Sequence, residues 1–222
     1  MHDYADFFAR GRVALLEGKA DYERPPVEGG ARWGAAAVLR PVGLVLEQLT
    51  DLAKSVGEAA GPGHWIHGCE TLHFTLRSLE RYRQVVPDDD PCRLAYAASL
   101  GEAVAGLPPV RIELRGVSPH VGGVLAVGYP VDDNLVTLQR RFAQSLRFRG
   151  VGDFESWVRD RWYVSLVHFA APVTDPEAVV DWCDEHADVP IGLAEIKAAD
   201  IVQAVHTGVG IRLNTLERSV LA

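Results

Sequence analysis

Two stretches of similar pattern decide the fold of this chain. The first is Glu70-Thr-Leu-His-Phe-Thr-Leu-Arg77, and the second, about ninety residues later, is Arg161-Trp-Tyr-Val-Ser-Leu-Val-His-Phe169. In each of them apolar side chains alternate with polar or aromatic ones. Strict alternation of this kind predicts a β-strand with one face turned toward the hydrophobic core.

The first stretch carries the residues with the clearest chemistry. Successive side chains of a strand point to opposite faces, so His73, Thr75 and Arg77 are expected to share one face. Histidine titrates near neutral pH and serves as a general base or acid, and a hydroxyl and a guanidinium bind phosphate oxygens. The alternative is a strand whose polar face meets only water.

The second stretch repeats the shape with different residues. Uninterrupted alternation places Arg161, Tyr163 and Ser165 on one face, and puts His168 on the other face among the packed side chains. A β-bulge near the end of the strand would instead turn His168 toward Tyr163. Arg161 is a candidate phosphate contact or an ordinary surface arginine.

The rest of the chain predicts a mixture of helices and strands. Strands are expected at residues 34–39, 72–79, 110–116, 123–129, 162–170, 191–196, 201–206 and 211–216. Helices are expected over residues 3–17, 42–59 and 93–105 and from residues 132 and 174 onward, where apolar side chains recur at helical spacing. Thr174 and Glu177 are spaced for a capping box at the start of the last helix.

These motifs resemble those of the 2H phosphoesterase superfamily, which includes the 2′-5′ RNA ligase-like proteins and cyclic phosphodiesterases. Members carry two His-hydrophobic-Thr/Ser-hydrophobic motifs, one in each of two pseudo-symmetric lobes. His73-Phe-Thr-Leu76 is similar to the first motif and Tyr163-Val-Ser-Leu166 to the second, with Tyr163 in place of the second histidine. Many relatives place an arginine three residues after the second Ser/Thr, where this chain has His168.

The resemblance implies an α+β fold in which two pseudo-symmetric lobes of antiparallel sheet carry helices on the outside and enclose a central cleft. The pairs Pro25-Pro26 and Gly29-Gly30 break regular structure, so residues 1–30 are expected to form a helical arm and linker ahead of a single bilobal domain over residues 31–222.

The resemblance further implies roles for individual residues. His73 is expected to act as general base or acid and Thr75 and Ser165 to bind phosphoryl oxygens, without a metal or another cofactor. Tyr163 is expected in the catalytic set as an altered partner, and Arg77, Arg161 and His168 as substrate-binding residues. A phenol, with a reference pKa near 10, is a proton donor but a poor base at neutral pH.

Composition restricts the partners. The chain has 222 residues with a net charge of −8, so a broad basic surface for nucleic acid is not expected, whereas a small phosphorylated or nucleotide-like ligand is. No apolar run is long enough to span a membrane, and neither a signal peptide nor a disulfide framework is evident, so a cytoplasmic location is expected. His64 and His67 form an HxxH pair that is expected in a solvated loop, and His120 is expected in an exposed turn.

Three functions remain open at this stage. The favoured one is a metal-independent phosphoesterase for a small nucleotide or an RNA-terminal phosphodiester, cyclic or 2′-5′ linked. Because Tyr163 replaces a histidine, a non-catalytic module that binds a nucleotide or phosphate ligand is the first alternative. The second is an enzyme of altered chemistry in a specialised metabolic pathway.

Overall fold

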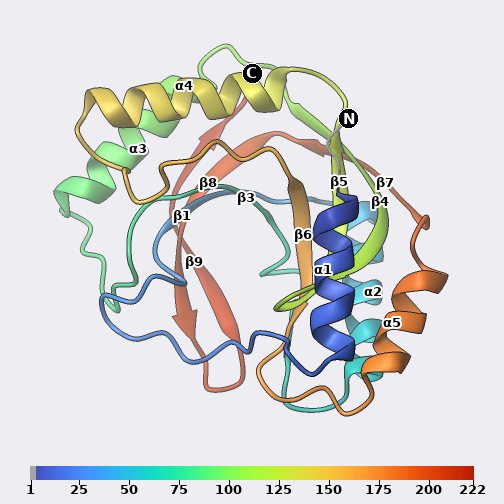
Figure 1. Ribbon diagram of the computed structural model, residues 1–222. Coiled ribbons are helices and arrows are strands. Elements are labelled where there is room, and N and C mark those ends of the chain that lie inside the picture. The colour runs from blue at the N-terminus through green and yellow to red at the C-terminus, as the bar shows by residue number, and fades with distance from the viewer. Residues whose placement is uncertain (1–3) are drawn as a thin grey trace.

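The computed structural model describes residues 4–222, which form an α+β fold built on one curled antiparallel sheet (Figure 1). The helices are α1 (Ala5–Leu16), α2 (Leu44–Ala60), α3 (Pro91–Val104), α4 (Asn134–Phe148) and α5 (Pro176–Glu185). The strands are β1 (Ala36–Leu39), β2 (Trp65–Ile66), β3 (Phe74–Ser78), β4 (Val110–His120), β5 (Gly123–Pro130), β6 (Trp162–His168), β7 (Pro190–Ile196), β8 (Ala198–His206) and β9 (Ile211–Val220).

The strand order shows the two pseudo-symmetric lobes that the resemblance implies. It runs β7-β4-β5-β6-β3-β1-β8-β9, with the short β2 paired to β6. One lobe contains β4 to β7 and the other β1, β3, β8 and β9. The lobes are joined directly where β3 pairs with β6, so they share one continuous sheet.

Helices cover the outer face of this sheet. The helix α2 contacts α5, β6 and β7, and α3 contacts α4, β8 and β9. The side chains between these layers, including Phe74, Phe142 and Val164, are fully buried. None of the helices in residues 4–222 is long and apolar enough to cross a lipid bilayer.

The N-terminal helix lies on the other face of the sheet, where β4, β5 and β6 run past it (Figure 1). On β5, Val124 and Ala126 belong to the main core, whereas Leu125 and Val127 pack against aromatic residues of α1. The strand β5 is therefore buried on both faces. The helix expected over residues 3–17 is confirmed as α1, although Asp3 lies outside the described residues.

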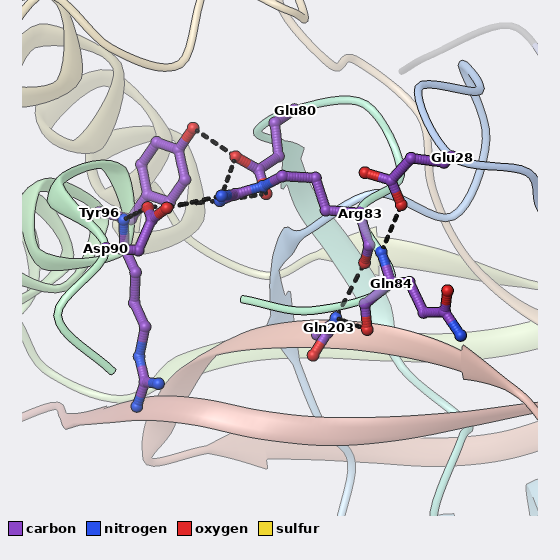
Figure 2. Close-up of polar contacts among 8 residues, drawn as sticks. Glu28, Glu80, Arg83, Gln84, Asp90, Tyr96 and Gln203 are labelled. Carbon is purple, nitrogen blue, oxygen red and sulfur yellow. Dashed lines mark hydrogen bonds and ion pairs between the residues drawn. The ribbon is translucent and has the colours of Figure 1, made fainter. Parts of the chain in front are cut away.

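A polar network fastens the segment that follows β3 (Figure 2). Arg83 forms ion pairs with Glu80 and Asp90, and the Tyr96 hydroxyl donates to Glu80. The backbone N–H of Gln84 donates to Glu28, and the Gln203 amide donates to the carbonyl oxygens of residues 83 and 84. The network thus ties the N-terminal linker to the lobe that contains β3 and β8.

The last helix begins one residue later than its sequence pattern predicts. Its N-cap is Asp175, whose carboxylate accepts a hydrogen bond from the Ala178 N–H at 3.0 Å, and Pro176 occupies the first helical position. The predicted capping box from Thr174 to Glu177 is therefore wrong. A carboxylate at Asp175 satisfies one of the unpaired N–H groups of the first turn, which removes the need for a Thr174 cap.

The hydroxyl of Tyr4 joins α1 to the sheet, and its removal gives the first testable prediction. This buried oxygen accepts a hydrogen bond from the Trp162 N–H at 2.8 Å and lies 3.3 Å from the Gly128 carbonyl oxygen. Tyr4→Phe leaves the Trp162 N–H without that acceptor, which costs about 1–3 kcal/mol of unfolding free energy. Urea unfolding measures the loss.

Tyr22→Phe is the matched control, because Tyr22 is exposed and its hydroxyl has no hydrogen bond within residues 4–222. Equal stability of Tyr4→Phe and Tyr22→Phe would contradict the assigned role of the Tyr4 hydroxyl.

Candidate active site

The pairing of β3 with β6 assembles the candidate site. The two strands are antiparallel with Phe74 opposite Val164, which sets His73 opposite Ser165 and Thr75 opposite Tyr163. All four of these side chains line one cavity of about 440 Å³ between the lobes. Residues ninety positions apart thus meet at one place.

A β-bulge in each strand determines which side chains beyond the motif face the cavity. On β3, Ala37 faces Arg77 and Val38 faces Thr75, so Leu76 is the extra residue. On β6, Val124 faces Val167 and Leu125 faces Ser165, so Leu166 is the extra residue. An extra residue reverses the alternation beyond it. Ser78 and His168 therefore line the cavity, and Arg77 and Val167 do not.

Arg77 lies outside the cavity for this reason. Its guanidinium donates to the carbonyl oxygens of Gly152 and Glu155 and so holds the loop that precedes β6. It lines a neighbouring cavity of about 720 Å³ instead, which also contains Trp157. The predicted common face of Arg77 with His73 and Thr75 is wrong, because the bulge at Leu76 interrupts the alternation.

Arg161 shares the face of Tyr163, as predicted, but it too lies outside the cavity. Its guanidinium stands over the ring of Phe7 in α1, 5.2 Å from the ring centroid. The ring of Phe7 also stacks on Tyr163, with a centroid distance of 6.2 Å. The N-terminal helix therefore separates Arg161 from the other candidate residues and packs on one side of Tyr163.

His73 is arranged to act as a base. Its Nδ1 lies 2.6 Å from the Thr71 carbonyl oxygen, which only accepts hydrogen bonds, so Nδ1 carries the proton. In the neutral ring the free lone pair is then on Nε2. Burial, together with the weaker effect of the positive charges of Arg40 and Arg159, lowers the pKa of His73 to about 4 in spite of the hydrogen bond to Thr71, which acts in the opposite direction. The imidazole is therefore neutral at pH 7.

His168 pairs with a second histidine. Its Nδ1 lies 2.7 Å from Nε2 of His67, and both rings are buried, with 8% and 5% of their surface exposed. Burial lowers the pKa of His67 to about 3, and burial together with the charges of neighbouring histidines lowers that of His168 well below its usual value. The position expected from uninterrupted alternation, on the face away from Tyr163, is wrong: the β-bulge, which was the alternative, turns the buried His168 toward the cavity.

The solvated positions expected for the other histidines are wrong. His64 and His67 are buried because β2 pairs with β6, which sets Trp65 opposite His168. His120 is half-buried with its ring 6.3 Å from that of His168. Its Nδ1 accepts a hydrogen bond from the Gly122 N–H, and its buried Nε2 has no partner within residues 4–222. Burial lowers the pKa of His120 to about 4.

The rim of the cavity carries aromatic and cationic residues that the motifs did not reveal. Trp33, in a left-handed conformation at φ 65°, places its ring against that of His168 and donates to Glu23 at 3.0 Å. Arg32 pairs with the same buried carboxylate of Glu23. Arg159 also lines the cavity and pairs with the buried Glu155 at 2.6 Å.

No cluster of three or more His, Cys, Asp or Glu side chains in residues 4–222 is arranged to hold a metal ion. The cavity therefore offers chemistry from imidazoles, hydroxyls and guanidinium groups. The expectation of a reaction without metal or cofactor stays a prediction.

Comparison with solved structures identifies the fold. No family model and no curated protein sequence matches the chain. The protein TT0787 of Thermus thermophilus superimposes with a TM-score of 0.62 at 16% identity, over 85% of this chain and 97% of its own. A phosphoesterase gives 0.59 at 14% identity, over 86% and 98% of the two chains. LigT of E. coli, complexed with 3′-AMP, gives 0.57 at 12% identity over the same shares.

These neighbours place the chain in one structural class. It has the fold of the 2H phosphoesterases, with the curled antiparallel sheet and two lobes that the sequence motifs imply. The resemblance inferred from His73-Phe-Thr-Leu76 and Tyr163-Val-Ser-Leu166 is thus confirmed at the level of the fold.

The buried imidazoles predict that the fold loses stability in acid. His67, His73 and His120 are neutral in the folded protein down to pH values of about 3 to 4, whereas in the unfolded chain they bind protons below about 6.5. The unfolded state therefore binds more protons as the pH falls through 6.5, and the free energy of unfolding decreases from there toward pH 4. The urea midpoint at pH 7.5 and at pH 5 measures this change.

His120→Gln should reduce the dependence on pH, whereas His186→Gln, at the end of α5 away from the cavity, serves as the control. An unfolding midpoint that is the same at pH 7.5 and pH 5 would exclude neutral, buried imidazoles.

Proposed function

We propose that this protein is a metal-independent phosphoesterase that acts on a small nucleotide or an RNA-terminal phosphodiester, cyclic or 2′-5′ linked. The observation that carries the proposal is the meeting of His73, Thr75 and Ser165 in one cavity across the β3–β6 pair. The fold shared with a phosphoesterase and with LigT, which has been crystallised with 3′-AMP and with phosphate, supports it.

The proposed reaction is an in-line attack of water on the phosphorus atom. Nε2 of His73 takes a proton from the water as the new P–O bond forms. The hydroxyls of Thr75 and Ser165 donate hydrogen bonds to the non-bridging oxygens, where negative charge increases in the transition state. The bond to the leaving ribose oxygen breaks, and that oxygen receives a proton from a donor on β6, the strand that brings both Tyr163 and His168 to the cavity.

The size and lining of the cavity favour a small ligand. A volume of about 440 Å³ is within the range of small-molecule sites, ~300–1,000 Å³. Trp33 and Trp157 offer ring faces for a nucleobase. The guanidinium groups of Arg32 and Arg159 add positive charge, although each is already paired with a carboxylate, so the site suits an ester of low charge better than a polyanion.

A non-catalytic binding module is the second candidate, and Tyr163 is the observation that favours it. A phenol does not exchange protons at neutral pH as readily as an imidazole. If no residue replaces the second histidine of the motif, the cavity binds a phosphate ester without turning it over. An altered reaction on another phosphorylated metabolite follows from the same substitution.

Hydrolysis of 2′,3′-cyclic nucleotides in the presence of EDTA tests the proposal. We expect measurable turnover by the wild type and a fall of about 10²–10⁴-fold in kcat for His73→Ala, because the general base is lost. His186→Ala is the matched control and should keep the wild-type rate. Turnover that survives in His73→Ala would overturn the assignment, and tight nucleotide binding without turnover would favour the binding module.

A further inference from the structure

The symmetric partner of His73 is poorly placed to exchange protons. The ring of Tyr163 belongs to an aromatic cluster formed by α1 and β5, whose other members are Tyr4, Phe7, Phe8, Leu125, Val127 and Tyr129. Phe7 stacks on the Tyr163 ring, with 6.2 Å between the ring centroids, so α1 packs against a side chain that also lines the cavity. Within residues 4–222 no side chain hydrogen-bonds to the hydroxyl of Tyr163, so no polar neighbour orients it toward a ligand.

The bulge at Leu166 in β6 turns the side chain of His168 toward the cavity. It lies three residues after Ser165 and lines the cavity together with His73. Its Nδ1 is engaged by His67 at 2.7 Å, so Nε2 is the ring atom left for a ligand. No group in the described part of the chain is bonded to that Nε2. The second motif has Tyr163 where a histidine is expected, but His168 of the same strand brings a second imidazole to the cavity.

His67 is held firmly enough to orient its neighbour. Its backbone N–H donates to the Leu166 carbonyl oxygen at 2.9 Å, which ties it to the bulge itself. The pair Trp65 and His168 lies opposite in the β2–β6 register, and the ring of Trp33 meets that of His168 edge to face at 5.1 Å. The rings of His67 and Trp33 thus pack directly against the ring of His168.

We propose that His168 is the second acid–base group of this site, in place of Tyr163, and that His67 is the positioning residue that fixes its tautomer. This inference rests on the proposed phosphoesterase function and assigns its missing proton donor. His67 accepts a hydrogen bond from Nδ1–H of His168, which directs Nε2 of His168 to the leaving group, as a carboxylate or carbonyl does for histidines in other sites.

The proton balance of the reaction is complete with these groups. Nε2 of His73 receives the proton of the attacking water, and Nε2–H of the His168 imidazolium passes its proton to the leaving ribose oxygen as the P–O bond breaks. His168 keeps its Nδ1–H bond to His67 throughout. One water is consumed, and the two imidazoles return to their starting states by proton exchange with solvent.

The bound ester supplies the charge that the imidazolium needs. In the free protein, burial above all disfavours a proton on His168, and the nearby His67, His120, Arg32 and His73 add to this effect, so the pKa of His168 is lowered. A phosphodiester anion in the cavity opposes these effects, because an opposite charge within about 4–6 Å favours the charged form. His67 remains a neutral acceptor, since its own pKa lies at about 3.

Variants at the two candidate donors test the assignment in the 2′,3′-cyclic nucleotide assay. We expect His168→Gln to lower kcat by about 10²–10⁴-fold with little change in KM, whereas Tyr163→Phe keeps kcat within about five-fold of the wild type. The opposite order, a severe loss in Tyr163→Phe and a wild-type rate in His168→Gln, would overturn the inference. Urea unfolding of each variant checks that it is folded.

The role of His67 has its own readout. His67→Ala should lower kcat and move the alkaline limb of the kcat–pH profile to lower pH, because the His168 imidazolium loses its acceptor. His67→Gln keeps an acceptor oxygen near the same place and should restore both. Equal losses in His67→Ala and His67→Gln without any shift of the profile would mean that His67 only fills space, and would overturn its positioning role.

Failure of this inference is distinguishable from failure of the proposed function. Turnover that is lost in His73→Ala but unchanged in His168→Gln removes only the inference. A wild type without turnover removes both. If His168→Gln does not fold, ¹⁵N NMR of the wild type with saturating inorganic phosphate replaces it: we expect a proton on Nδ1 of His168, and an unprotonated Nδ1 would contradict the proposal.

Discussion

The single antiparallel contact of Phe74 with Val164 is the constraint on which the rest of the site depends. Both side chains are fully buried between the sheet and its outer helices, so neither strand can slip without exposing them. Gly128 on β5 supports this packing, because a Cβ there would lie 2.8 Å from the ring of Phe74 and 3.0 Å from Ile112. The register of the two motif strands is thereby fixed from the core side, and the cavity follows from it.

Pseudo-symmetry extends beyond the motifs to the irregularities that flank them. Each motif strand carries its extra residue two positions after the central contact, at Leu76 and at Leu166. The bulges aim Ser78 and His168 at the cavity from equivalent positions. The positions of the histidines are not symmetric. His73 comes one residue before Phe74 in one lobe, whereas His168 comes four residues after Val164 in the other. Two imidazoles face one cavity in spite of the replacement at Tyr163.

Much of this arrangement was predictable from the sequence, and the missed parts have a common physical cause. The alternation of side chains along a strand is a local property, so the sequence correctly predicts that His73 shares a face with Thr75 and that Tyr163 shares a face with Ser165. A bulge depends on how a strand pairs with its neighbour, so the positions of Arg77 and His168 were not readable from their own strands. The burial of His67 depends in the same way on the pairing of β2 with β6, about a hundred residues apart. The packing of α1 against Tyr163 through Phe7 is likewise a tertiary contact, so no local sequence pattern predicts it.

A crystal structure of the protein soaked with inorganic phosphate would show whether both imidazoles reach one anion. We expect one phosphate in the cavity, within hydrogen-bond distance of Nε2 of both His73 and His168 and of the Thr75 and Ser165 hydroxyls. A phosphate bound elsewhere, or one reached by only one of the two imidazoles while the other faces protein, would contradict it.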